Sequence, residues 1–427
     1  MFFHRIGRSL AIVFSLFLLL FLIPSLTQAG WQIYTIQSMN HFAYWYPIRS
    51  LALDDQGCAH LAYGTDILNY TSSLSWENNL AWLVENVNNA VTIPTEIKGF
   101  AALALDAANN PHLCCISNGC LIYAHKMGMD WTFRTIDDSL NSCISISISM
   151  ALDLQGSVHI SYYDCRQKKL KYVSFNGDKI DDEDESKSNE DESKPNDEGV
   201  NKLIVSQIVD DCRGAGTENS LASDLVGNIH IAYYDEFQQD LKYACKSGES
   251  GWTIEVVDST GDVGYCPALA VDRDGNPCIS YCDWTNRNLK YARRSNEGWI
   301  TETVDGSLDK TGESTSIALD HEGRPHISYF NRSAHALMYA VYDGQTWQTQ
   351  LVNKDEDIDG STSLALDSSG QAHIIYYNYT TNSLKYAILK EDTQSSSASS
   401  ANNVSGVNRK GSIFNEGFGC FLSAIKI

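Results

Sequence analysis

The chain repeats one pattern seven times: an apolar strand that ends in Asp, a turn that contains Gly in all but one copy, and a Tyr-rich strand. The clearest copies run from Ser316 to Asn331 and from Ser363 to Asn378. The strand-ending residues are Asp54, Asp106, Asp153, Asp224, Asp272, Asp320 and Asp367, at steps of 52, 47, 71, 48, 48 and 47 residues. A period in the forties with several short strands per unit predicts a β-propeller.

One unit predicts four short antiparallel strands. In the sixth unit, an apolar run at 316–320 is followed by turn residues at 321–325 and by a second strand at 326–330. A third strand is expected at 337–340 and a fourth from Trp347 to Val352. The apolar character of the strands fits sheets that are covered on both faces by neighbouring sheets.

The last unit lacks its fourth strand, and the start of the predicted mature chain supplies one. Residues 30–36 (GWQIYTI) match 251–257 (GWTIEVV), the fourth strand of another unit. We therefore expect an all-β, seven-bladed β-propeller of four-stranded antiparallel blades, closed by the N-terminal strand in the last blade. Closure of this kind removes exposed strand edges.

Recurrent aromatic residues are expected to pack blade against blade. The third strands carry Tyr70, Tyr123, Tyr172, Tyr243, Tyr291, Tyr339 and Tyr386, and the fourth strands carry Trp82, Trp131, Trp252, Trp299 and Trp347. In the third unit, Ile204 takes the position of the Trp.

The two ends and one insertion differ in composition from the repeats. Residues 1–29 predict a signal peptide, with a basic start, an apolar run from Leu10 to Leu22 and a small-residue cleavage site before Gly30; an uncleaved anchor is the alternative. Residues 178–199 form an acidic insert that we expect to be disordered, with 11 acidic residues against three lysines. Residues 391–427 predict a Ser-rich flexible tail. The domain order is therefore signal peptide, propeller at 30–390 and tail, in a secreted or cell-surface protein.

The formal net charge of −22 argues against a nucleic-acid partner. It favours a self-repelling exported protein that we expect to be monomeric, without a membrane span after signal cleavage. No cofactor is expected. The acidic connections at 258–262 and 355–360 leave a surface calcium ion as a possibility, although neither has the full spacing of an EF-hand.

The 12 cysteines of an exported chain predict some disulfides. Two pairs are expected between a first and a second strand, Cys266–Cys282 and Cys143–Cys165, and a third pair, Cys115–Cys120, flanks a tight turn. The alternative is that several cysteines are buried thiols.

Six histidines occupy one position of the repeat, and Cys278 occupies the seventh: His60, His112, His159, His230, His326 and His373. One His per blade is spread around a ring, whereas a metal ion needs three or four ligands close together. We therefore predict no metal site from these residues. The expected role is structural, with the imidazole bonded to the strand-ending Asp or to a turn amide.

Connections between second and third strands place aromatic residues beside Asp or Asn, with Arg nearby. The candidate ligand-binding residues are Asp164, Arg166, Asp235, Asp283, Trp284, Arg287, Asn331, Arg332, Asn378 and Tyr379. Sugar recognition needs this mixture, because aromatic faces cover C–H surfaces and planar polar groups bind hydroxyls. The alternative is that Asp and Asn merely begin turns.

The pattern LDxxGxxHISYYD…LKYA…W resembles exported bacterial and archaeal propellers of uncharacterised function, which are similar in fold to fucose-specific lectins and sialidases. The resemblance covers 30–390 and implies a fold more than an activity. The spacing from Asp367 to Gly370 departs from sialidase Asp boxes, and the catalytic set of a sialidase cannot be assembled. The tail around Cys420 also resembles the Gly-Cys-Phe-Ile box of some exported prokaryotic surface proteins.

These observations lead to a lectin-like, non-catalytic binding protein whose loops recognise a glycan or an extracellular protein. No catalytic residue is assigned, since catalysis breaks symmetry and the polar residues mostly follow the repeat. A glycoside hydrolase or lyase over the central channel is the alternative, and a structural cell-surface module is a further one.

Overall fold

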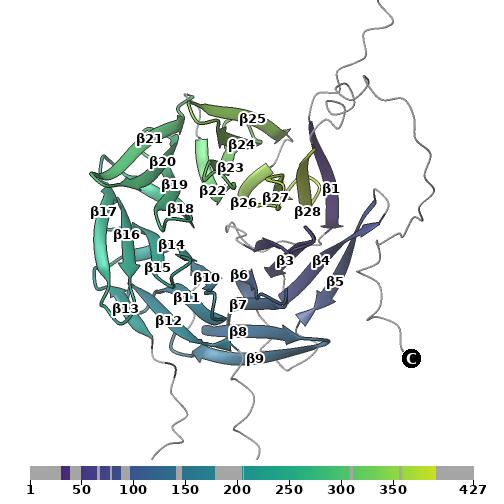
Figure 1. Cartoon of the computed structure of the whole chain (residues 1–427), viewed down its shortest axis with the longest axis horizontal. Coiled ribbons are helices and arrows are strands. Elements are labelled where there is room, and N and C mark those ends of the chain that lie inside the picture. The colour runs from purple at the N-terminus through teal and green to yellow at the C-terminus, as the bar shows by residue number, and fades with distance from the viewer. Residues whose placement is uncertain are drawn as a thin grey trace, which may run out of the picture. The chain divides into compact units, whose positions relative to one another are not determined.

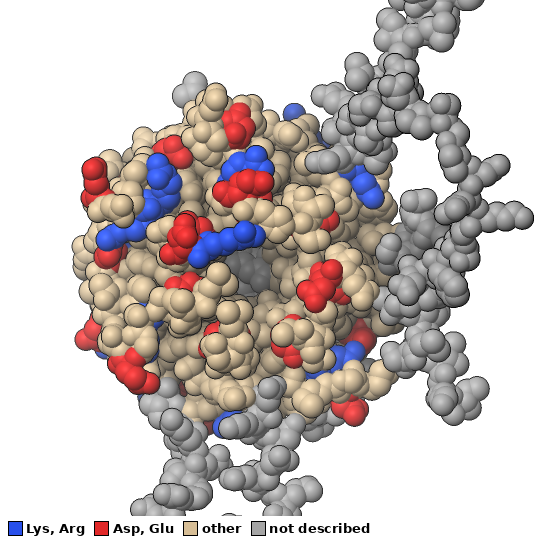
Figure 2. Space-filling model, viewed as in Figure 1, with Lys and Arg blue, Asp and Glu red and all other residues tan. Residues whose placement is uncertain are grey.

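The computed structural model describes residues 30–38, 50–64, 68–76, 79–87, 97–140, 147–177, 204, 206–307, 311–354 and 358–390. The predicted signal peptide, acidic insert and tail lie outside these residues. A compact unit spans Trp31–Lys390. Seven four-stranded antiparallel sheets surround a central opening in it, so the predicted seven-bladed propeller is confirmed (Figures 1 and 2).

Each blade uses four strands, numbered here outward from the opening. Blade 1 contains β2 (Leu51–Leu53), β3 (Ala59–Gly64), β4 (Leu68–Trp76) and β5 (Asn79–Asn86). Blade 2 contains β6 (Ile97–Leu105), β7 (Pro111–Ser117), β8 (Cys120–Met127) and β9 (Asp130–Asp137). Blade 3 contains β10 (Ile148–Leu152), β11 (Ser157–Asp164), β12 (Lys169–Asn176) and β13 (Gln207–Asp210).

The remaining blades follow the same plan. Blade 4 contains β14 (Ala215–Ser223), β15 (Ile229–Asp235), β16 (Asp240–Lys246) and β17 (Thr253–Asp258). Blade 5 contains β18 (Val263–Val271), β19 (Pro277–Asp283), β20 (Asn288–Ser295) and β21 (Gly298–Asp305). Blade 6 contains β22 (Thr311–Leu319), β23 (Pro325–Asn331), β24 (Ala336–Tyr342) and β25 (Trp347–Lys354). Blade 7 contains β26 (Ile358–Leu366), β27 (Ala372–Asn378) and β28 (Ser383–Lys390), with β1 (Gly30–Ser38) beside β28.

The N-terminal strand therefore closes the ring, as the sequence predicted. Lys385 of β28 donates a hydrogen bond to Thr35 of β1 at 2.8 Å. Trp31 of the same strand packs edge-to-face on Tyr339 of blade 6, with ring centroids 5.2 Å apart. Because the first and the last described strands share one sheet, the ring cannot open without breaking that sheet.

The second strand of each blade forms the core. β15, β19, β23 and β27 are buried at every residue, which follows from a sheet that is covered on both faces. Between neighbouring blades, the third-strand Tyr meets the fourth-strand Trp of another blade at 5.1–5.5 Å and 65–77°, an edge-to-face geometry. The predicted blade-to-blade role of these aromatic residues is confirmed.

Blade 3 has no Trp in its fourth strand, and Ile204 packs near Tyr123 as the sequence indicated, while a Phe supplies the aromatic contact. Phe175 of β12 packs edge-to-face on Tyr123 of blade 2, with centroids 5.0 Å apart. Ile204 precedes β13 and is partly buried against the hydrophobic cluster that contains Tyr123. The aromatic contact thus comes from the third strand, and the aliphatic residue fills the space beside it.

Antiparallel strands give the ring two different ends. The first-turn face carries the turns between first and second strands, for example 54–58. The loop face, at the opposite end, carries the connections between second and third strands, for example 164–169.

Candidate functional site

At the first-turn face, each repeated Asp organises its own turn. Oδ1 of Asp54 accepts hydrogen bonds from the backbone N–H groups of Gln56 and Cys58 at 2.9 and 2.8 Å. Oδ2 lies 3.2 Å from Nε2 of His60, and Nδ1 of His60 lies 2.5 Å from the hydroxyl of Tyr70. This Asp–His–Tyr line connects three strands of one blade.

The line recurs around the ring. The Asp–His distance is 3.1–3.4 Å in blades 1, 3, 4, 6 and 7, where the predicted structural role of the histidine is confirmed. Burial lowers the pKa of the five imidazoles below the ordinary 6.5 despite the neighbouring Asp, and they are His60, His159, His230, His326 and His373. In blade 5, Tyr291 donates instead to Sγ of Cys278 at 3.1 Å.

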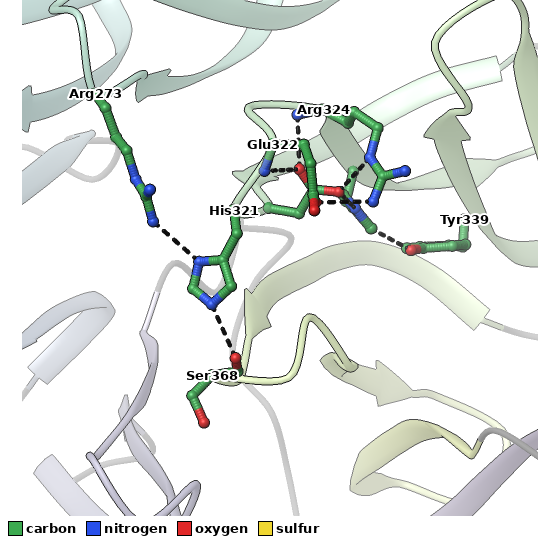
Figure 3. Close-up of polar contacts among 8 residues, drawn as sticks. Arg273, His321, Glu322, Arg324, Tyr339 and Ser368 are labelled. Atoms are coloured by element: carbon green, nitrogen blue, oxygen red, sulfur yellow. Dashed lines mark hydrogen bonds and ion pairs between the residues drawn. The ribbon is translucent and has the colours of Figure 1, made fainter. Parts of the chain in front are cut away.

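The first turns of blades 5, 6 and 7 are also joined to one another. Arg273 donates to Nδ1 of His321 at 3.2 Å, and Nε2 of His321 donates to the carbonyl of Ser368 at 2.9 Å (Figure 3). Arg324 closes its own turn through Asp320 at 2.6 Å. These contacts are exposed and join turns of three blades, so their contribution to stability is small.

At the loop face, the predicted Asp and Asn ligands cap turns. Asp164 accepts the N–H groups of Arg166 and Gln167, both at 2.9 Å, and is only 1% exposed. The other four residues are likewise buried and accept a backbone N–H at 2.8–3.0 Å: Asp235, Asp283, Asn331 and Asn378. The turn alternative therefore describes these side chains, and direct ligand contact has to come from exposed neighbours.

Buried lysines reinforce some of these caps. Nζ of Lys242 lies 2.6 Å from Asp235 and 3.4 Å from Asp210 of the preceding blade, while Tyr233 donates to Asp210 at 2.7 Å. Burial opposes the charge on Lys242, but the two carboxylates raise its pKa above the ordinary value. Lys171 stands in the same place beside Asp164 at 2.6 Å. Such ion pairs join one blade to the next and leave little for a ligand to bind.

The exposed neighbours do form a cavity at one place. A cavity of 310 Å³ between blades 5 and 6 is lined by Cys282, Trp284, Thr285, Arg287, Thr311 and Glu313. Trp284 is 44% exposed, and Arg287 is also exposed. Two of the predicted ligand residues, Trp284 and Arg287, therefore meet there.

Aromatic rings continue from this cavity toward blade 4. Trp284 lies 5.4 Å from Tyr265, and Tyr265 lies 4.4 Å from Tyr234, measured between ring centroids. Tyr234 donates to Asp262 at 2.8 Å. Burial raises the pKa of Tyr265 to about 12, so this phenol is neutral near pH 7 and offers a hydrogen bond rather than a basic oxygen.

A carboxylate completes the cavity wall. Glu313 lies 3.4 Å from Arg332 of the adjacent second-to-third-strand connection, which brings a third predicted residue to the edge of the site. Three residues of this site, Tyr265, Thr311 and Glu313, are not among those predicted from the sequence. Their signal was weak, since Tyr265 and Glu313 lie in irregular first-strand segments, each following a positive-φ glycine.

The remaining predicted residues lie elsewhere. Arg166 is exposed in blade 3, and Tyr379 packs on Tyr377 in blade 7 with centroids 4.6 Å apart. Neither lines the cavity. Two acidic connections were candidates for a calcium site. In the first, Asp258 accepts hydrogen bonds from Tyr281 and Lys290. In the second, 355–360, the side chains are not among those that the structure describes.

Two predicted disulfides are absent from the described residues. Cys266 and Cys282 carry thiols, because a bulge at Cys266 (φ +49°) puts Tyr265 opposite Cys282. Cys115 and Cys120 also carry thiols. Cys120 pairs with Ser117, so the two cysteines are diagonal neighbours at about 7–8 Å, beyond the ~4.4–6.8 Å of a disulfide.

Cys165 is disulfide-bonded, while the other nine described cysteines are thiols. Cys143, its predicted partner, lies outside the described residues. The pair Cys143–Cys165 stays a prediction.

Two groups of described residues bring three metal-type donors within 4.8 Å of one another. One is Asp210, Cys212 and Asp235, and it already surrounds the Lys242 ammonium. The other is Asp106, His112 and His125 in blade 2.

The described part of the chain contains no helix with the length and hydrophobicity of a membrane span.

Comparisons with known proteins concern the fold. No protein-family model matches the chain, and no curated protein matches it. Among solved structures, AofleA of Arthrobotrys oligospora is 11% identical with a TM-score of 0.49, covering 82% of this chain and 91% of its own. The fucose-specific lectin of Aleuria aurantia is 12% identical with a TM-score of 0.42, covering 67% and 89%. The polysaccharide lyase Uly1 is 11% identical with a TM-score of 0.47, covering 86% and 95%.

These similarities include the predicted one to a fucose-specific lectin. At such identities and TM-scores they give no information about ligand or activity. The resemblance to sialidases stays a prediction.

Proposed function

We propose that this protein binds a glycan in the cavity between blades 5 and 6. The observation that carries the proposal is Trp284, which exposes an aromatic face beside Arg287 and Glu313 in a concave site. An aromatic face suits the C–H surface of a pyranose, and the charged groups suit its hydroxyls or a carboxylate. The cavity volume of 310 Å³ lies in the range of small-ligand sites.

A loop residue that differs between blades supports a single ligand-binding site per chain. The residue after the turn-capping Asp or Asn differs in every one of five blades: Cys165, Glu236, Trp284, Arg332 and Tyr379. The caps themselves hardly vary, because they hold the turn. A ligand site built from the variable position is therefore not repeated around the ring. With the signal peptide predicted at 1–29, we place this binding outside the cell, in a secreted or cell-surface protein.

The test is binding of purified protein to a broad glycan array, in calcium and again in chelator, followed by titration of any hit. Trp284→Ala should weaken binding about tenfold or more, because a central aromatic anchor dominates small interfaces. Phe237→Ala is the matched control: it removes an exposed aromatic residue of the loop face in blade 4, outside the cavity lining.

Equal affinity of the wild type and Trp284→Ala would contradict the proposed site. An array that stays blank in both conditions would contradict glycan binding itself, and a protein partner would then be sought with the same two variants.

A polysaccharide lyase or hydrolase is the second candidate, favoured by one observation. Glu313 is a half-buried carboxylate that lines the cavity and lies beside Arg332. A single carboxylate in a ligand cavity can act as a general acid or base. Incubation of any bound glycan with protein, and mass spectrometry of the products, decides the matter: cleavage that Glu313→Gln abolishes while binding remains would establish an enzyme.

A further inference from the structure

Blade 2 departs from the repeat at the first-turn face, on the end of the ring opposite the glycan cavity. The third-strand residue paired with the repeat His is His125 in this blade. In the other blades the same position holds Ser72, Ser174, Cys245, Arg293, Val341 or Ile388. Two imidazoles therefore lie side by side only here among the described blades.

The local geometry gathers three donors. One side-chain atom each of Asp106, His112 and His125 lies within 4.8 Å of the other two. The two imidazole rings are stacked, with centroids 4.3 Å apart and planes inclined by 24°. His112 and His125 are 1% and 3% exposed, whereas the side chain of Asp106 retains 19% exposure and leaves a route from solvent.

The spacing of Asp106 and His112 also differs from the repeat. Oδ2 and Nε2 are 3.7 Å apart here, against 3.1–3.4 Å in the five other Asp–His lines. Two atoms that each lie about 2.0–2.2 Å from a tetrahedral zinc ion are separated by roughly 3.3–3.6 Å. At 3.7 Å the two atoms are too far apart for a good hydrogen bond, and they lie just beyond the separation of two ligands of one ion.

We propose that Asp106, His112 and His125 bind one divalent transition-metal ion, for which zinc is the best fit. Two imidazoles and a carboxylate are borderline donors that suit zinc better than calcium or magnesium. Three protein ligands leave a fourth position for water, on the side where Asp106 is exposed.

Neighbouring groups hold the ligands in place. Nδ1 of His112 lies 2.5 Å from the hydroxyl of Tyr123, and this contact orients the ring so that its Nε2 faces Asp106. Asp106 receives the side-chain N–H of Asn110 on Oδ2 at 2.9 Å and two backbone N–H groups on Oδ1. Orientation of metal ligands by such partners is usual in built metal sites.

The ion would join three segments of blade 2: the end of β6, the start of β7 and the third strand β8. Its role is therefore structural, and it is independent of the glycan site on the loop face. It also lies apart from the second donor group, where the ammonium of Lys242 takes the place of a cation.

The test uses purified protein that has been stripped with a chelator and then titrated with zinc chloride, with Co²⁺ as a spectroscopic probe. We expect one zinc per chain, a melting temperature that rises with zinc concentration, and Co²⁺ absorption without the thiolate charge-transfer band that a cysteine site would show. His125→Ser is the matched variant, because Ser72 and Ser174 occupy this position in blades 1 and 3. It should melt like the stripped wild type and should lose the zinc-dependent rise.

His335→Ser, which removes an exposed imidazole from blade 6, should keep stoichiometric zinc. Overturning results are a stripped wild type that takes up no zinc, zinc uptake that His125→Ser retains, or a Co²⁺ spectrum dominated by thiolate. Glycan binding serves as a fold check, since His125→Ser should leave the loop face unchanged.

Discussion

A single side-chain position shows how strongly the repeat is used for structure. The His after the first turn connects the capping Asp to the third-strand Tyr in five blades. In blade 5, the thiol of Cys278 accepts only the hydroxyl of Tyr291. The His ring is therefore a set of buried hydrogen-bonded connections rather than a shared chemical site. Buried polar groups of this kind are costly to leave without a partner.

Two substitutions of His326, to Ala and to Cys, should differ in their effect on stability. His326→Ala should lower the free energy of unfolding by about 1–3 kcal/mol, because Asp320 and Tyr339 lose a buried partner. His326→Cys should cost less, since Cys278 accepts the hydroxyl of Tyr291 at the same place in blade 5. Urea unfolding monitored by circular dichroism measures both. A Cys variant as unstable as the Ala variant would contradict this account.

Among the elements, the closing strand β1 stabilises two blades at once. β1 is far from β28 in sequence, yet it completes blade 7 and places Trp31 against blade 6. Trp31 packs on a buried cluster that includes Tyr339, Leu364 and Ile374. The strand thus contacts two blades and prevents an open sheet edge at β28.

This contact predicts different costs for two residues of the same strand. Trp31→Ala should destabilise the protein by about 2–4 kcal/mol, because a large ring leaves a packed interface. Ile33→Ala is the control, at less than about 1 kcal/mol, since Ile33 is 40% exposed. Equilibrium urea unfolding gives both values. Equal effects would mean that β1 acts through its backbone alone.

In the whole molecule, the structural contacts repeat from blade to blade, whereas the candidate sites do not. The buried caps, the Asp–His–Tyr lines and the Tyr–Trp contacts repeat from blade to blade. The cavity with Trp284 and Glu313 and the donor group at His125 occur where the repeat is broken. Selection for a stable ring explains the first set, so specific chemistry has to be sought in the second.

The ring as a whole also predicts how stability depends on pH. Burial lowers the pKa of five imidazoles in the folded state below 6.5. As the pH falls below about 6.5, the unfolded chain takes up protons that the folded chain does not, so the free energy of unfolding falls. A second loss follows below 3.8, the ordinary pKa of Asp, because the caps Asp153, Asp224 and Asp320 have lowered pKa values in the fold.

Urea unfolding at several pH values between about 7.5 and 5 measures the first effect. The free energy of unfolding should be nearly constant above about pH 7 and should decrease steadily below it. His326→Cys, which removes one of the five groups, should show a shallower decrease. A flat profile over this range would show that the imidazoles titrate alike in both states.

The number of blades, their four strands and the closure by residues 30–36 could be predicted, because they follow from repetition and periodicity along the chain. The sequence also indicated the structural use of the repeated His and Tyr. It placed Trp284 and Arg287 among many candidates without showing that they share a cavity. The roles of Glu313, Tyr265 and His125 were not predicted. The predicted Cys266–Cys282 disulfide was wrong, because a bulge at Cys266 changes the strand pairing.

Which residues from different strands or blades meet follows from the tertiary structure and not from the sequence. The cavity beside Trp284 lies between blades 5 and 6, and the donor group of blade 2 combines a turn, a second strand and a third strand. Contacts between blades depend on bulges, on register and on the angle between neighbouring sheets. None of these leaves a periodic signal in the sequence, and that is the physical reason why the scaffold could be predicted and the sites could not.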